Sequence, residues 1–66
     1  MKLRINGETR EVPDGLTVSG LLEHLALGGG RVAVEVNAEV IRRARHPEVR
    51  LRDGDEVEIV TFVGGG

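Results

Sequence analysis

The sequence contains no cysteine, tryptophan or tyrosine, and Phe62 is its only aromatic residue. Without cysteine, the chain has no disulfide, no thiolate nucleophile and no cysteine ligand for a metal. Acidic residues outnumber basic ones by eleven to nine, which gives a formal net charge of -2. Because nucleic acids are bound by basic surfaces and stacking aromatic rings, we expect no nucleic-acid partner.

Long apolar runs are also missing from the chain. Residues 1–5 alternate like a strand, and no uninterrupted apolar stretch has the length that a signal peptide or a membrane span needs. This pattern predicts a cytoplasmic protein with no membrane partner. With 66 residues the chain has room for one small core, so we expect a single domain over residues 1–66.

The first part of the chain carries two turn signals. Asn6 and Gly7 lie between two strand-like segments and predict a β-hairpin, because both central positions of a tight hairpin turn need positive φ. The segment 13–15, Pro-Asp-Gly, predicts a second turn, since proline presets its own φ and glycine accepts conformations that other residues avoid. A hairpin followed by a turn therefore opens the fold.

A short helix is predicted to follow the second turn. Thr17 is a good N-cap residue, and Leu16 before it can pack on Leu21 as a hydrophobic staple. Gly20 weakens this helix by about 1 kcal/mol relative to alanine, and the glycine run 28–30 is expected to end it. The apolar stripe has four members at helical spacing: Val18, Leu21, Leu22 and Leu25.

The second half of the chain reads as strands and turns. Residues 32–36 and 39–41 predict two strands joined by a turn, and residues 56–63 form the longest β-prone run. The order of elements predicts an α+β protein with the β-grasp (ubiquitin-like) fold, a mixed four- to five-stranded sheet with one helix packed across one face. The first and last strands are expected side by side in the middle of that sheet.

Side chains of the last predicted strand alternate between two faces. If the helix covers the face that holds Val57 and Ile59, then Val60 and Phe62 form an exposed apolar patch that, with Val63, binds a partner. The alternative is that Val60 and Phe62 belong to the core, because central parallel strands are often buried on both faces.

The sequence ends in three glycines, Gly64, Gly65 and Gly66. Consecutive glycines lose much backbone entropy when they are ordered and gain no side-chain contacts, so we expect residues 64–66 to form a flexible tail. About five extended residues reach roughly 15 Å, far enough to thread a narrow channel in a partner enzyme. The alternative is ordinary fraying of a chain end, or a short appended segment.

The reactive group of this tail is the carboxylate of Gly66. A terminal carboxylate is ionised at neutral pH, so it can attack the α-phosphate of ATP and form an acyl-adenylate. Gly64 and Gly65 give the tail clearance and reach. Since the chain has no cysteine, any sulfur chemistry at this end must use sulfur from another molecule.

Three segments of the chain together form a recognisable pattern: Glu35-Val36-Asn37, Val49-x-Leu51-x-Asp53-Gly54-Asp55-x-Val57-Glu58-Ile59-Val60 and Phe62-Val63-Gly64-Gly65-Gly66. In these segments the chain resembles the ThiS family, the sulfur carriers of thiamine biosynthesis. The hairpin and the start of the helix match as well, so the resemblance covers the whole chain. Two departures are a third terminal glycine and Gly20, which stands where a charged residue is common.

The resemblance implies a protein co-substrate rather than an enzyme. A ThiF-type adenylyltransferase, using ATP and magnesium, would activate Gly66, and sulfur from a persulfide donor such as a cysteine desulfurase would replace AMP to leave a thiocarboxylate. A ThiG-type thiazole synthase would then take this sulfur for the thiazole moiety of thiamine. The resemblance implies no cofactor bound by the chain itself.

Three other functions stay open at this point. The small subunit of molybdopterin synthase is a sulfur carrier with the same fold and a terminal diglycine, although the short length and the ending at residues 62–64 favour the thiamine member. A non-catalytic β-grasp binding or regulatory module would need no free glycine end, and a ubiquitin-like modifier would be conjugated through it. We expect no metal site, because His24 and His46 lack the spacing and the carboxylate neighbours of a metal pair.

Overall fold

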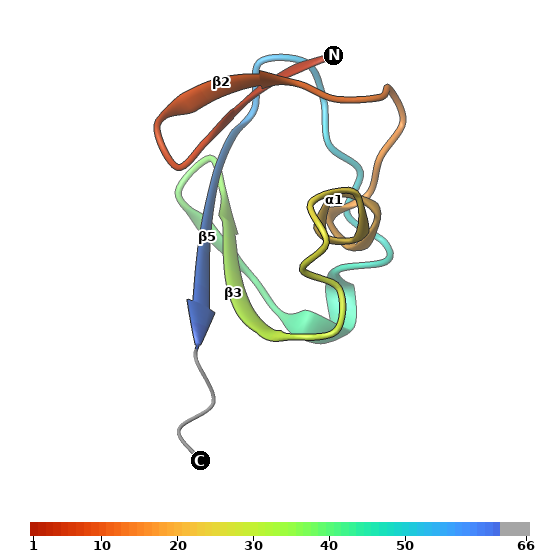
Figure 1. Ribbon diagram of the computed structural model, residues 1–66, viewed down its shortest axis with the longest axis vertical. Helices are drawn as coiled ribbons and strands as arrows, with labels where there is room; N and C mark the ends of the chain where they lie inside the picture. Colours follow the sequence, from red (N-terminus) through yellow and green to blue (C-terminus); the bar gives the residue numbers. More distant parts are fainter. Residues whose placement is uncertain (63–66) are drawn as a thin grey trace.

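The computed structural model describes residues 1–62 of the chain, as one sheet with a helix beside it (Figure 1). Its elements are β1 (Lys2–Ile5), β2 (Glu8–Glu11), α1 (Val18–His24), β3 (Arg31–Val36), β4 (Glu39–Ile41), a 3₁₀ turn (Arg43–Arg45) and β5 (Glu56–Phe62). The strand order is β2-β1-β5-β3-β4, with β1 and β5 parallel and the other pairs antiparallel. The predicted β-grasp fold is therefore confirmed.

Two hairpins, β1-β2 and β3-β4, lie on either side of the central strand β5. Each turns through two residues with positive φ: 50° and 83° at Asn6 and Gly7, 50° and 68° at Asn37 and Ala38. Positive φ at both central positions matches the right-handed twist of the strands that the turn joins. The predicted hairpin at Asn6-Gly7 is confirmed, and the second turn uses alanine where glycine is preferred.

Both turn asparagines bind β5 through their side chains. The Oδ1 atom of Asn6 accepts a hydrogen bond from the backbone N–H of Ile59 at 2.7 Å, and its Nδ2 donates to the carbonyl of the same residue at 3.1 Å. The Oδ1 atom of Asn37 accepts from the N–H of Glu56 at 3.0 Å, while its Nδ2 donates to Asp55 at 3.0 Å. Each hairpin turn is thus fastened to the central strand at a defined register.

The helix begins as the sequence predicts. Thr17 is the N-cap, and its hydroxyl accepts a hydrogen bond from the N–H of Gly20 at 3.1 Å. A Cβ atom at Gly20 would lie 3.2 Å from Cδ2 of Leu16 and 3.5 Å from Oγ1 of Thr17. The glycine therefore makes room for Leu16 against the helix start, which offsets part of its low helix propensity. Within residues 1–62, no helix has the length and apolar character needed to cross a bilayer.

The helix ends earlier than the glycine run predicts. It stops at His24, and Ala26 follows in the left-handed region with a φ of 62°. The N–H of Ala26 donates to the carbonyl of Glu23 at 3.0 Å, and that of Leu27 donates to the carbonyl of Leu22 at 2.7 Å. This is the Schellman pattern of helix termination. The expectation that the glycines end the helix was wrong, because backbone hydrogen bonds close it before the run begins.

The chain between β4 and β5 ties the helix to the sheet. The backbone N–H of Val18 donates to the carbonyl of Val49, and the N–H of Leu51 donates to the carbonyl of Leu16, both at 2.9 Å. The N–H of Ser19 donates to the carbonyl of His46 at 3.0 Å. These bonds fix how α1 crosses the sheet.

The core lies between α1 and the one sheet face that the helix covers (Figure 1). Side chains from β1, β3, β5, the helix and two connecting segments meet there. The opposite face of the sheet, which we call the outer face, contributes nothing to this core. The buried apolar residues are Leu3, Ile5, Val12, Val18, Leu21, Leu22, Val34, Leu51, Val57 and Ile59.

Replacing the left-handed alanines with glycine should stabilise the domain. The left-handed conformation costs a non-glycine residue about 1–2 kcal/mol, partly offset by the extra entropy that glycine loses on folding. We expect Ala26→Gly and Ala38→Gly each to raise the free energy of unfolding by about 0.5–1 kcal/mol, as measured by urea denaturation.

The matched control for these variants is Ala33→Gly, at an exposed strand position. There the added backbone freedom has no compensating benefit, so unfolding should become easier by about 0.5–1 kcal/mol. A destabilised Ala26→Gly variant would contradict the Schellman description of the helix end.

Candidate functional site

Strand β5 leads from the middle of the sheet toward the glycine end of the sequence. Its antiparallel ladder with β3 pairs Ala33 with Val60 and Arg31 with Phe62. Its parallel pairing with β1 lies at the other end of the strand, where Arg4 is the partner of Glu56. Phe62, the last residue of the strand, is therefore held in the sheet by β3.

The two faces of β5 differ sharply in burial. Val57 and Ile59 are 0% and 7% exposed beneath α1, whereas Val60 and Phe62 on the outer face are 55% and 56% exposed. A single helix covers a single face, so the outer face of this central strand stays open to solvent. The alternative that Val60 and Phe62 belong to the core is wrong for this reason.

The structure thus brings together two of the three residues that the sequence predicts as a partner-binding patch. Val63, the third, lies outside the described residues. So do Gly64, Gly65 and Gly66, and with them the predicted flexible tail. The roles of all six residues in binding and chemistry stay predictions.

A third apolar side chain on the outer face was missed by the sequence reasoning. Val40 of β4 is 67% exposed, and it is the register partner of Glu35, an outer-face residue of β3. Its exposure follows from alternation, since the neighbouring Ile41 pairs with the buried Val34. The signal was present in the sequence, but it needed the alternation of β4 as well as that of β5.

A shallow hollow lies beside the end of β5. Its volume is about 350 Å³, and it is lined by Arg31, Val32, Arg43 and Phe62. Sequence reasoning did not find it, because Arg43 comes from the 3₁₀ turn and reaches this place only through the tertiary fold. At the end of β5, the aromatic ring of Phe62 therefore lines the same hollow as the guanidinium-bearing side chains of Arg31 and Arg43.

Other titratable groups have structural roles away from this end. His46 is buried, and its Nε2 lies 3.0 Å from the carbonyl oxygen of Ile41. The amino group of Met1 donates to Asp14 at 2.7 Å, and this hydrogen bond raises the pKa of that amino group. Over residues 1–62, no three His, Asp or Glu side chains gather where they could hold a metal ion.

Comparison with known families identifies the chain. A model of the ThiS family matches residues 3–66, which is nearly the full sequence. The chain belongs to the ThiS family. The match runs through the three terminal glycines, so the glycine end lies within the family's own pattern.

The chain is similar in sequence to relatives of two kinds. A protein named sulfur carrier protein ThiS, from Bacillus subtilis (strain 168), is 43% identical over 65 residues, covering 97% of this chain and 98% of the relative. A protein named thiazole synthase, from Paramagnetospirillum magneticum, is 46% identical over 66 residues. The chain spans 20% of the length of that protein and of a second thiazole synthase, from Magnetococcus marinus.

A solved structure has the same fold. The crystal structure of a thiamine biosynthesis protein (ThiS) from Geobacter metallireducens aligns with a TM-score of 0.85 and 38% sequence identity, over 100% of both chains. The ThiS-type β-grasp architecture of the chain is therefore established by fold and by sequence together.

The exposure of Phe62 gives a test of the outer face. We expect Phe62→Ser to lower the free energy of unfolding by about 1 kcal/mol or less, because a half-exposed ring loses some strand propensity and only part of the apolar burial of a core ring. Ile59→Ala on the buried face of the same strand should lower it by about 2–5 kcal/mol. Equal losses in thermal or urea denaturation would mean that Phe62 is a core residue.

Proposed function

We propose that this chain is a sulfur carrier for thiazole formation in thiamine biosynthesis. In this function it is a recycled protein co-substrate and not a catalyst. Its reactive group is the terminal carboxylate of Gly66, and Gly64 and Gly65 form the slender segment that enters the active sites of its partners. We expect the cycle to run in the cytoplasm.

The proposed cycle begins with activation of the carboxylate. An oxygen of Gly66 attacks the α-phosphorus of ATP, pyrophosphate leaves, and the acyl-adenylate forms on a ThiF-type adenylyltransferase that uses magnesium. A persulfide sulfur, supplied by a donor such as a cysteine desulfurase, then attacks the carbonyl carbon and AMP leaves. A thiol reduces the resulting acyl disulfide, which leaves the thiocarboxylate on Gly66. The persulfide and the reducing thiol must both come from other molecules, because this chain has no cysteine.

A thiazole synthase is the proposed recipient of the sulfur. Proteins named thiazole synthase contain a segment similar to the whole of this chain, at 46% and 41% identity, which supports a close working relationship between the two. Two relatives that match this chain over nearly their whole length, at 43% and 39% identity, are named sulfur carrier protein ThiS.

The observation that carries the proposal is the range of residues that the family model matches. It covers residues 3–66 and so includes both the β-grasp body and the glycines that follow β5. A β-grasp module that only binds or regulates would not need these glycines. The exposed Val60 and Phe62, at the end of β5, offer an apolar surface for a partner next to the reactive end.

Incubation with the adenylyltransferase, ATP, magnesium and a persulfide donor should convert the chain to its thiocarboxylate. Mass spectrometry of the intact protein should show a mass increase equal to the difference between sulfur and oxygen. Deletion of Gly65 and Gly66 should abolish this change, because the reactive carboxylate is then displaced toward the domain by two residues.

The control for the deletion is its melting temperature, which shows whether the domain is still folded. A ladder of conjugates with other proteins would indicate a ubiquitin-like modifier and contradict the proposal. Sulfur that passes from the loaded chain to a molybdopterin precursor, and not to a thiazole, would assign the chain to the sister pathway.

A further inference from the structure

Within residues 1–62, two arginines beside the last residue of β5 take part in no ion pair. Arg31 of β3 is the register partner of Phe62, which places the two Cα atoms about 5 Å apart. Arg43 reaches the same place from the 3₁₀ turn, and both arginines line the hollow of about 350 Å³ together with Val32 and Phe62. The two guanidinium groups are therefore open to an anion from outside the described part of the chain.

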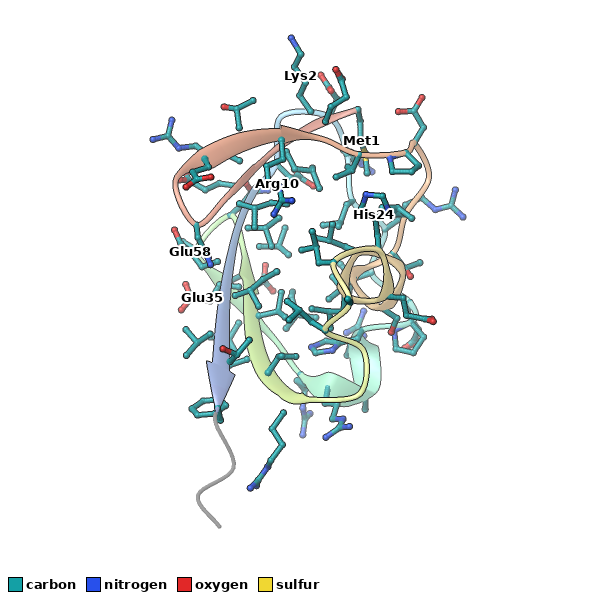
Figure 2. All side chains as sticks on the ribbon, in the orientation of Figure 1. Met1, Lys2, Arg10, His24, Glu35 and Glu58 are labelled. Atoms are coloured by element: carbon teal, nitrogen blue, oxygen red, sulfur yellow. The ribbon has the colours of Figure 1, made fainter. Side chains whose placement is uncertain are left out.

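The surroundings of this hollow restrict where an anion can bind. Nearer the middle of β5 the outer face is acidic, because Glu35 and Glu58 are register partners there (Figure 2). A second hollow, of about 580 Å³, shares Val32 and Arg43 with the first, but the Glu23 side chain is part of its lining. Guanidinium groups bind carboxylates and phosphates through charge-assisted hydrogen bonds. An anion is therefore expected in the hollow beside Arg31 and Phe62.

The chain itself supplies an anion that can reach this hollow. Four residues follow Phe62, and they end in the carboxylate of Gly66. Four extended residues span about 13 Å. Three of the four are glycines, which can turn back toward Arg31 because positive φ costs them little, and which bring no Cβ atoms into the hollow.

The tether favours this carboxylate over an anion from solution. Phe62 lines the hollow, so the segment that carries the carboxylate begins at the rim of the place where it would bind. A group held by so short a tether has an effective concentration in the millimolar range. Two exposed ion pairs are weak individually, but at this concentration they can hold the chain end for much of the time.

We propose that the hollow of Arg31, Arg43 and Phe62 binds the carboxylate of Gly66 of the same chain while no partner enzyme is bound. The thiocarboxylate that replaces it carries the same negative charge and binds in the same place. A partner enzyme must then take the chain end out of the hollow before it can use it. The statement about the thiocarboxylate rests on the proposed function, whereas docking of the carboxylate does not.

A chain with a carboxamide in place of the terminal carboxylate tests the docking at unchanged length, because amidation removes only the charge. The NMR signals of the Nε–H groups of Arg31 and Arg43 should differ between the acid and the amide. The signal of Arg10, an exposed arginine on β2 far from the hollow, should be the same in both (Figure 2). Unchanged signals of Arg31 and Arg43 would overturn the proposal.

Two other occupants of the hollow give different results in the same experiment. Inorganic phosphate should shift the arginine signals more in the amide than in the acid, since the tethered carboxylate competes with it. Equal shifts in both chains would show an open anion site and overturn the assignment to Gly66. A difference between acid and amide that disappears on dilution would mean that the carboxylate comes from a second copy, and it would also overturn the proposal.

Removal of Gly66 by a carboxypeptidase gives a second readout. Arg31→Gln and Arg43→Gln should each raise the rate of removal by about twofold to fivefold, the factor that one exposed ion pair provides. Arg10→Gln is the matched control, because it removes the same charge from an exposed position that does not line the hollow. Its rate should equal that of the parent chain, and equal rates in all four proteins would contradict the docked state.

Neither measurement uses a partner enzyme, so this inference and the proposed function can fail separately. If the arginine signals ignore the amide while the parent chain is adenylated and loaded with sulfur, the docking is wrong and the carrier function stands. If the signals respond but the chain is never adenylated, the carrier function is wrong and docking of the carboxylate stands.

Discussion

The hydrogen bonds between two asparagine side chains and β5 are the constraint on which the rest of the structure depends. In the sheet, β5 lies between the β1-β2 hairpin and the β3-β4 hairpin and pairs with one strand of each. Asn6 reaches β5 from one hairpin turn and Asn37 from the other. The positive φ of each asparagine thus does two things: it closes a hairpin, and it turns an amide toward the central strand.

A single short helix explains why the outer face is available for binding. α1 covers the face that holds Val57 and Ile59, and the described residues contain no second α-helix to cover the other face. In a larger α/β protein a central parallel strand would be buried on both sides. Here the chain is too short to cover both faces, so Val60, Phe62, Glu35 and Glu58 stay in contact with solvent. A chain of this size therefore exposes as surface what a larger protein would use as core.

Much of this architecture is predictable from local patterns. The Asn6-Gly7 turn, the Thr17 cap and the alternation in β5 each follow from chemistry within a few residues, and all three agree with the structure. The helix end was not predictable in the same way, because alanine at residue 26 takes a conformation that usually calls for glycine. Its hydrogen bonds form only when the helix is already in place.

In the candidate site, too, some features follow from the local sequence and others depend on the assembled fold. Exposure of Val60 and Phe62 depended on which face the helix covers, and the sequence alone left that open. The opposition of Glu35 and Glu58 depended on the register between β3 and β5, which come from distant parts of the chain. Residue types near the glycine end were readable from the sequence, whereas the arrangement of charges around them required the sheet to be assembled.

The parallel pairing of β1 with β5 has a consequence for how the protein is made. Ile5 and Val57 are register partners, so the contact that completes the centre of the sheet joins residues separated by most of the domain. Bringing two such distant residues together costs loop-closure entropy, and the pairing of β1 with β5 that offsets this cost can form only after β5 has been synthesised. During synthesis the β1-β2 hairpin must therefore wait, with the inner face of the sheet unfinished, until β5 has emerged from the ribosome. We therefore expect the sheet to be completed late in synthesis. A truncation that removes β5 should give an unfolded, protease-sensitive chain and not a partly folded carrier.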